Sequence, residues 1–319
     1  MQSIDDGAFV DVNGVPHWLT LRGADRSNPA LLLLGGPGSC FAALAPFFVD
    51  WEREFTLVQW DQPGGGFTFA KSGAEATTVA RLVDDGLRVV ELVRERLQVP
   101  KLALLGFSGG TIVGLEMARR RPELFSAYIG SGQVVDWARQ DAASYALLLA
   151  RARTLRDETM LHELTAIGPP PYAHAATDAV KSKYAGAPTP REAHAFAEFR
   201  PLVGAALQRM PAGARYFAPG LQWPDLLARS FAAYTALRGE IVAFDARRRS
   251  LTFGVPMFFL QGADDLFTVT AEVAAYAAEI AAPHVELVQI DGSGHATLFL
   301  RNEFLALLVR HVRPKLLDS

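Results

Sequence analysis

The chain alternates between short apolar runs and longer amphipathic stretches. Residues 30–34, 55–60 and 102–107 are predominantly apolar, and each run ends in a turn of glycine or polar residues. Runs of this kind are typical of strands that are buried on both faces. Residues 78–97 instead carry apolar side chains at helical spacing, and Pro100 ends this pattern. Strands that alternate with helices predict an α/β fold, in which a mostly parallel sheet has helices on both faces.

The alternation stops in the middle of the chain. Residues 135–250 show helical stretches interrupted by prolines, and they contain no clear strand. The α/β pattern is clear on both sides of this segment. We therefore predict a parallel-sheet core formed by 1–134 and 251–319, with 135–250 inserted between them as a helical cap. The further elements expected in the core are strands over 127–129, 256–260 and 285–290, and helices over 110–120, 270–281 and 298–312.

The first residues predict a different element, a β-hairpin. Residues 9–12 and 16–22 flank the pair Asn13-Gly14. Both residues of this pair tolerate positive φ angles, which a type I′ turn requires. We therefore expect two antiparallel strands joined by this turn.

Composition narrows the functional classes. Half of the 319 residues are apolar and a fifth are charged, so the chain can bury a large core, and long disordered stretches are not expected. The net charge of −3 gives no basic surface for nucleic acid or an anionic membrane. No apolar run suits a membrane span, and the first residues do not resemble a signal peptide. Because Cys40 is the single cysteine, no internal disulfide can form, and a cytoplasmic protein is expected.

The segment Gly106-Phe107-Ser108-Gly109-Gly110 is a Gly-x-Ser-x-Gly pattern at the junction of a predicted strand and a predicted helix. This junction is the setting in which a nucleophilic serine is lifted clear of a sheet on a sharp, strained turn. The helix that follows would point its amides toward developing negative charge. A phosphate-binding turn is the alternative, but the segment lacks the lysine of a P-loop. We therefore predict that Ser108 is the nucleophile of a serine hydrolase.

A serine hydroxyl is a weak nucleophile unless a base removes its proton. His295 directly follows the predicted strand 285–290, at the carboxyl edge of the sheet where functional loops collect. The acid that orients the base should follow a strand between Ser108 and His295. Asp264 and Asp265 both stand there, and one of them is expected to hold the imidazole while the other is solvated or caps a turn.

Acyl transfer builds negative charge on the carbonyl oxygen of the substrate, and backbone amides must receive it. One donor should be the amide of Gly109, the residue after the nucleophile. The other should come from the glycine-rich loop 35–38, which follows the first apolar run. Within this loop we expect Gly36 to be the donor, with Gly35 as the second choice.

Three segments resemble the prolyl aminopeptidase (proline iminopeptidase) branch of the α/β-hydrolases. The family segments read His-Gly-Gly-Pro-Gly, Asp-Gln-Arg-Gly and Gly-x-x-Asp. The resemblance covers about 8–135 and 253–315, implies an α/β-hydrolase fold, and favours Asp265 as the acid. The chain departs from the family at Leu34 and Pro63, where the family has His and Arg. The matching segments are Leu34-Gly35-Gly36-Pro37-Gly38, Asp61-Gln62-Pro63-Gly64 and Gly262-Ala263-Asp264-Asp265.

The predicted cap leaves the substrate open. Its many aromatic residues suggest an apolar pocket over Ser108 and a small substrate. An aminopeptidase acting on short peptides or amino-acid amides needs an unpaired cap carboxylate to hold the amine, whereas an esterase or lactonase acting on a small apolar acyl compound does not. The oxyanion and acid segments that resemble the prolyl aminopeptidase branch favour the aminopeptidase over the esterase or lactonase. A binding protein without turnover is the third alternative. The cap acids available for an amine are Glu163, Glu192, Glu198, Asp225 and Glu240, and each is interpreted as lying on a solvated helix face.

Neither a metal nor another cofactor is expected. His194 and Glu198 have the i, i+4 spacing that can seat a metal ion, but no third ligand is evident in the sequence, so a plain helix face is the better interpretation. The expected partner is therefore a small-molecule or short-peptide substrate, with no nucleic acid and no membrane. The sequence leaves the oligomeric state open.

Overall fold

The computed structural model describes residues 2–73, 77–198 and 232–317. Within these residues, eight strands form one sheet in the order β1-β2-β4-β3-β5-β6-β7-β8. The hairpin strands β1 and β2 and the pair β2–β4 are antiparallel, and every other neighbouring pair is parallel. The predicted α/β fold with a mostly parallel sheet is therefore confirmed. The strands are β1 (Ile4–Val12), β2 (Val15–Gly23), β3 (Ala30–Leu34), β4 (Thr56–Trp60), β5 (Leu102–Phe107), β6 (Phe125–Ser131), β7 (Met257–Gly262) and β8 (Val285–Ile290).

The predicted hairpin turn is present between β1 and β2. Asn13 and Gly14 both have positive φ angles, of 52° and 86°, as a type I′ turn requires. The hairpin is longer than the sequence pattern suggested: β1 begins at Ile4, and its residues alternate between partly buried and exposed positions although the residue types do not alternate.

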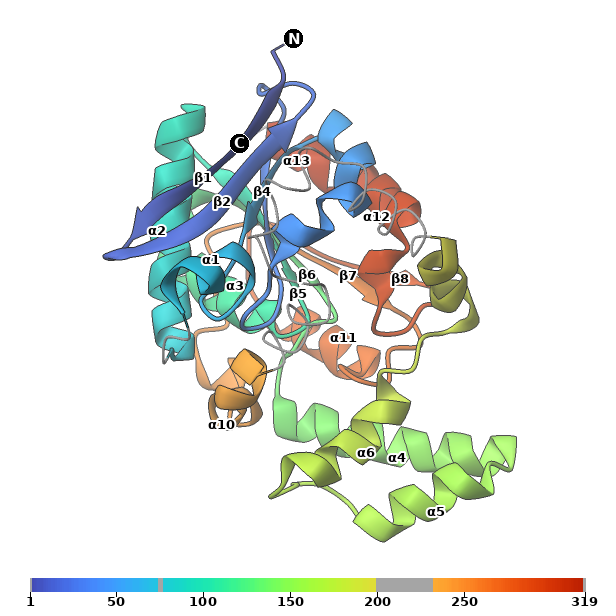
Figure 1. Ribbon diagram of the computed structural model, residues 1–319. Helices are drawn as coiled ribbons and strands as arrows, with labels where there is room; N and C mark the ends of the chain where they lie inside the picture. Colours follow the sequence, from blue (N-terminus) through green and yellow to red (C-terminus); the bar gives the residue numbers. More distant parts are fainter. Residues whose placement is uncertain (1, 74–76, 199–231, 318–319) are drawn as a thin grey trace.

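Helices cover both faces of the sheet (Figure 1). Alternation along β3 shows how the two faces are filled: Leu32 and Leu34 pack in the cluster that includes α2, α3 and α11, while Leu31 and Leu33 pack in the cluster that includes η1 and α12. The helices of the core are η1 (Phe41–Arg53), α1 (Gly66–Ser72), α2 (Val79–Leu97), α3 (Gly110–Arg120), η2 (Pro122–Leu124), α11 (Thr270–Glu279), η4 (Thr297–Phe299), α12 (Arg301–Leu307), η5 (Leu308–Val312) and α13 (Arg313–Leu317).

Two of these helical regions differ from the sequence prediction. The 3₁₀ helix η1 was not expected, because Pro46 lies inside it and the apolar spacing is irregular. The helix predicted over 298–312 is instead divided among η4, α12 and the π turn η5, and it continues as α13.

The segment 135–250 contains helices with an apolar cluster of their own, formed by residues of α4, α5 and α6 such as Leu148 and Leu164. These three helices form a separate layer below the sheet in Figure 1. The two ends of the segment meet, because the amide of Ala246 donates to the carbonyl of Val135 at 2.7 Å. The helices are α4 (Trp137–Leu155), α5 (Glu158–Ile167), α6 (Ala175–Ala185), α10 (Arg238–Val242) and η3 (Ala246–Arg248), together with helical residues 190–198 and 232–236.

Candidate active site

Ser108 occupies the tight turn between β5 and α3. Its φ angle is 52°, a left-handed conformation that is strained for a residue with a side chain. The flanking glycines make the turn possible: a Cβ at Gly106 would lie 2.9 Å from the Cα of Thr111, and a Cβ at Gly110 would overlap the carbonyl oxygen of Leu34. The structure thus has the strained strand–turn–helix geometry that the Gly-x-Ser-x-Gly pattern predicts.

His295 lies in the loop after β8 and faces the serine. Its Nε2 atom is 2.9 Å from Ser108 Oγ, a distance at which the hydroxyl can donate its proton to the ring. The rings of Phe107 and Phe267 pack on the imidazole with centroid distances of 5.6 and 4.7 Å. A Cβ at Gly132 would lie 2.9 Å from His295 Cε1, so the ring is confined on that side also.

Asp265 completes a hydrogen-bonded chain of three side chains. Its Oδ2 atom lies 3.0 Å from His295 Nδ1, and because a carboxylate only accepts, Nδ1 carries the proton and Nε2 is free to accept from Ser108. Asp265 is buried, while the neighbouring Asp264 is exposed. The structure therefore brings Asp265, and not Asp264, to the imidazole.

Four further hydrogen bonds hold the Asp265 carboxylate. It accepts from Gln261 Nε2 at 2.8 Å, from the amides of Phe267 and Thr268 at 2.7 and 2.9 Å, and from the Thr268 hydroxyl at 2.6 Å. Burial by itself raises the pKa of Asp265, but the charge of His295 and the hydrogen bonds from His295 and Thr268 outweigh it and lower the pKa below its ordinary value. The carboxylate is thus kept ionised beside the imidazole.

Sequence reasoning missed Gln261 and Thr268. Thr268 stands three residues after Asp265, and an aspartate that accepts from amides two and three residues ahead is a recognised turn pattern, so the spacing was a usable signal. No comparable signal marks Gln261. It lies inside β7, and only the fold turns its amide toward the carboxylate.

The two amides predicted to receive the substrate oxygen lie side by side. A Cβ at Gly109 would come within 3.2 Å of the Cα of Gly36, so the two backbones approach closely. In the described part of the chain, neither of these amides donates a hydrogen bond. Gly35 is placed differently, because a Cβ there would meet the Ser39 side chain at 2.5 Å. The backbones of Gly36 and Gly109 therefore lie next to each other, directly after Ser108 in the case of Gly109.

Gln62 supports this glycine loop, and the adjacent Asp61 holds the start of α1. Gln62 Nε2 donates to the carbonyl of Gly35 at 3.1 Å, and the Asp61 carboxyl accepts from the amide of Phe67 at 2.9 Å, at the start of α1. Asp61 is completely buried, and this burial raises its pKa to about 7. The segment that resembles Asp-Gln-Arg-Gly thus supports the loop, and it does not contact the serine.

The cap acids named from the sequence occupy different environments. Glu163 pairs with Lys183 at 2.9 Å. Glu240 accepts from the amide of Val79, at the start of α2. Asp225 lies outside the described residues.

Glu192 contradicts the expectation of a solvated helix face. Its exposed fraction is 0%, and it accepts hydrogen bonds from Ser293, Gly294 and Thr189. No local pattern indicated this, because the residues that Glu192 contacts in the His295 loop lie about one hundred positions further along the chain.

The pair His194 and Glu198 is an exposed ion pair with a distance of 3.3 Å. Across the residues that the structure describes, no group of three or more His, Cys, Asp or Glu side chains is arranged to hold a metal ion. The same residues contain no helix that is long and apolar enough to cross a membrane.

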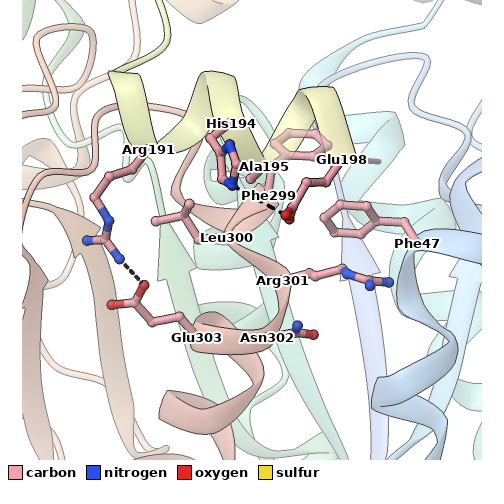
Figure 2. A pocket seen from close by; sticks show the side chains of 10 residues that line it. All are labelled: Phe47, Arg191, His194, Ala195, Glu198, Phe299, Leu300, Arg301, Asn302 and Glu303. Carbon is pink, nitrogen blue, oxygen red and sulfur yellow. Dashed lines mark hydrogen bonds and ion pairs between the residues drawn. The ribbon is translucent and has the colours of Figure 1, made fainter. Parts of the chain in front are cut away.

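A pocket of about 280 Å³ lies between the helical residues 190–198 and the start of α12 (Figure 2). Ser108 is not among its lining residues, but the lining residue Phe299 packs against Phe107, which precedes Ser108, and against Phe196. The lining residues are Phe47, Arg191, His194, Ala195, Glu198, Phe299, Leu300, Arg301, Asn302 and Glu303.

The chain belongs to the alpha/beta hydrolase fold family, whose model matches residues 29–301. A full-length relative from Bacillus subtilis (strain 168), named "Probable aminopeptidase YbaC", is 26% identical over 96% of this chain and 96% of its own length. A proline iminopeptidase of Arabidopsis thaliana is 27% identical over 38% of this chain and 32% of its own length. The resemblance to this branch that the motifs predicted is therefore confirmed.

Solved structures show the same fold at low sequence identity. The proline iminopeptidase-related protein of Thermus thermophilus has a TM-score of 0.64 and 19% identity, covering 98% of this chain and 99% of that one. An enzyme described as degrading N-acyl homoserine lactones has a TM-score of 0.62 and 18% identity, covering 95% of this chain and all of that one. At such identities the likeness extends to the fold alone.

Proposed function

We propose that this protein is a serine hydrolase that forms an acyl-enzyme on Ser108. The observation that carries the proposal is the continuous chain of hydrogen bonds from Ser108 Oγ through His295 to Asp265. A pure binding protein has no need of a base and an acid aligned behind a strained serine. These hydrogen bonds therefore support a protein that turns over a substrate, rather than one that only binds it.

The mechanism follows from these positions. His295 Nε2 takes the proton as Ser108 Oγ attacks the carbonyl carbon, and Asp265 stabilises the imidazolium that forms. The amides of Gly36 and Gly109 receive the negative charge that develops on the carbonyl oxygen. The imidazolium then gives its proton to the leaving group. A water molecule, activated by the same base, releases the acyl group from the serine and restores the enzyme.

We propose that 135–250 is a cap over this site. The ring of Tyr234 supports this, because it lies 4.0 Å from the position of a Cβ on Gly109, beside the proposed oxyanion donors. Phe267, which packs on the imidazole, also packs against the apolar cluster of α4, α5 and α6. A cap at this place restricts the site to small substrates with an apolar group.

For the substrate we propose a short peptide or an amino-acid amide, from which the first residue is released. The relative that spans nearly the whole chain and is named a probable aminopeptidase supports this choice. So do the three segments that resemble the prolyl aminopeptidase branch.

An ester or lactone of a small apolar acid is the second candidate, and a specific observation favours it. Of the five cap acids named from the sequence, four are described, and all four are engaged by protein groups: Glu163, Glu192, Glu198 and Glu240. Each of these four carboxylates thus already has a protein partner, which disfavours its use for a substrate amine.

Two experiments test the proposal. A fluorophosphonate should modify Ser108, as shown by intact mass and peptide mapping, and Ser108→Ala should remain folded and unlabelled. Labelling at another serine, or none on folded protein, would overturn the nucleophile. A panel of amino-acid arylamides, their N-acetylated forms and short-chain aryl esters then separates the substrates. Faster turnover of arylamides with a free amine supports the aminopeptidase, and turnover of the aryl esters alone supports the esterase.

A further inference from the structure

Glu192 lies near the beginning of the helical residues 190–198. Its Oε2 atom accepts from the amide of Thr189 at 2.9 Å, while its own amide donates to Thr189 Oγ1 at 3.3 Å. This reciprocal arrangement is a capping box, which stabilises the start of a helix. A capping box needs only one of the two carboxylate oxygens.

The other oxygen reaches across to a distant part of the chain. Oε1 accepts from the hydroxyl of Ser293 at 2.9 Å and from the amide of Gly294 at 2.8 Å. These two residues directly precede His295. Glu192 therefore joins the proposed cap to the loop that carries the proposed base.

The burial of Glu192 shows that more than helix capping is involved. Its exposed fraction is 0%, and in the described part of the chain it has no Lys or Arg partner within ion-pair distance. A buried carboxylate is costly unless hydrogen bonds compensate it, and capping does not require burial. The donors that compensate this carboxylate are the helix start and the His295 loop, so removing the carboxylate leaves the buried amide of Gly294 without an acceptor.

The His295 loop is held by contacts on two sides, from the core and from the proposed cap. On the core side, the amide of Asp264 donates to the carbonyl of Ser293 at 2.8 Å, and a Cβ at Gly262 would overlap the carbonyl oxygen of Gly294. On the cap side, Glu192 is assisted by Arg191, which donates to the carbonyl of Asp291.

Arg191 is itself fixed to the core, because it forms an ion pair with Glu303 of α12 (Figure 2). The loop thus has backbone contacts on one side and two adjacent cap side chains on the other.

We propose that Glu192 is a positioning residue for His295: by holding residues 293 and 294, it keeps the imidazole at hydrogen-bond distance from Ser108. The inference rests on the proposed function, since it assigns to Glu192 an effect on the proposed base. Misplacing a reacting group by about 1 Å can cost on the order of 100-fold in rate. Glu192 should therefore act on the rate of serine attack and not on substrate affinity.

The test compares three variants of Glu192 with a matched control. Glu192→Ala removes the carboxylate, and Glu192→Asp keeps the charge but is too short to reach both Thr189 and Gly294. Glu192→Gln keeps an oxygen that can accept from Ser293 and Gly294. Glu198→Ala, on the same helix but 70% exposed at its side chain, is the control. Each protein is assayed for the rate constant of Ser108 modification by a fluorophosphonate, for kcat and KM with an aryl ester, and for thermal unfolding.

We expect Glu192→Ala to slow modification of Ser108 and to lower kcat by about 10- to 100-fold, with KM changed by less than about twofold. Glu192→Asp should lose less, and Glu192→Gln should recover most of the rate. Glu198→Ala should match the wild type. A selective rise in KM, or an equal loss in Glu198→Ala, would overturn the inference.

Folding is judged separately from rate. If Glu192→Ala does not fold, Glu192→Asp decides, and a wild-type rate in that variant overturns the inference. If the wild type is labelled at Ser108 and a folded Glu192→Ala variant is labelled equally fast, the inference is overturned while the proposed function stands. A wild type that is not labelled at Ser108 overturns the proposed function, and the inference with it.

Discussion

The Ser108 turn and the His295 loop lie side by side, yet they are held in different ways. The turn is shaped mainly by its own sequence, because the glycines on either side of Ser108 allow the close approach of the backbone. The His295 loop has local hydrogen bonds too, from the Thr297 hydroxyl to the carbonyl of Gly294 and between Thr297 and Ser293. It is held in addition by Glu192 and Arg191 from the segment 135–250 and by the amide of Asp264. The proposed nucleophile is thus set mainly by local backbone geometry, whereas the proposed base depends also on contacts from distant parts of the chain.

This difference matters for reading function from sequence. A residue set by local geometry leaves a short motif, as Gly-x-Ser-x-Gly does. A residue set by distant side chains leaves only its order in the chain and its place at a strand end. Both the local geometry at Ser108 and the distant contacts around His295 must be in place for the hydrogen bond of 2.9 Å between these two residues to form.

The largest expected effect comes from removing the proposed base itself. His295→Ala should lower kcat by about 10⁴- to 10⁶-fold and leave the fold intact, because the hydroxyl of Ser108 then has no proton acceptor. Steady-state kinetics and thermal unfolding measure the two parts of this prediction. His194→Ala, at a side chain that is 77% exposed, is the control. A loss of only severalfold in His295→Ala would place the base elsewhere.

The acid loop offers a paired test at adjacent positions. Asp265→Asn should lower kcat by about 10⁴-fold, because an amide in place of the carboxylate no longer enforces the Nδ1–H form of the imidazole. Asp264→Asn should leave kcat within about twofold, since that side chain is exposed. Kinetics of the two variants under one set of conditions decide the matter. A larger loss in Asp264→Asn would show that the hydrogen bonds to Asp265 are not the ones that catalysis uses.

The loop of Gly36 is held by Gln62, and the neighbouring Asp61 is a buried acid that holds the start of α1. Burial raises the pKa of Asp61 to about 7, whereas the unfolded chain has a value near 3.8. Between these values the folded protein keeps a proton that the unfolded chain has lost. The free energy of unfolding should therefore fall as the pH rises from 4 to 7, by up to about 4 kcal/mol at 1.36 kcal/mol per pH unit.

Asp61→Asn tests this because the amide cannot ionise. The free energy of unfolding of the variant should fall less than that of the wild type as the pH rises from 4 to 7. The difference between the two proteins in favour of the variant should be greatest at pH 7 and above. Denaturant titrations at several pH values provide the measurement. Parallel stability curves for the two proteins would contradict a raised pKa at this position.

The smallest expected effect tests the local shaping of the serine turn. Gly110→Ala should destabilise the protein by about 3 kcal/mol, because the added Cβ overlaps the carbonyl oxygen of Leu34 and the backbone must shift. Gly239→Ala is the control, since a Cβ there meets no atom within 4 Å and the residue lies in α10. Equal melting temperatures for both variants would show that the turn tolerates side chains after all.

Periodicity and turn chemistry were enough to predict much of the core. The strands Ala30–Leu34 and Val285–Ile290 and the helix Gly110–Arg120 have the predicted bounds, and the Asn13-Gly14 turn has the predicted backbone. Each of these depends on neighbours in the chain, through apolar patterning or allowed φ angles. Elements such as η1 escaped prediction, because their helical form depends on packing against the sheet and overrides an internal proline.

The sequence by itself determined the order of Ser108, Asp265 and His295, the proposed nucleophile, acid and base, and their places at three strand ends, because those features depend on local motifs and on strand succession. The sequence favoured Asp265 over Asp264 through the Gly-x-x-Asp resemblance, and the tertiary structure places Asp265 against His295. Only the tertiary structure decided that Gln261 and Glu192 turn inward to hold this aspartate and the His295 loop. Hydrogen bonds between residues about one hundred positions apart form only when the folded backbone brings their donors and acceptors within 3 Å.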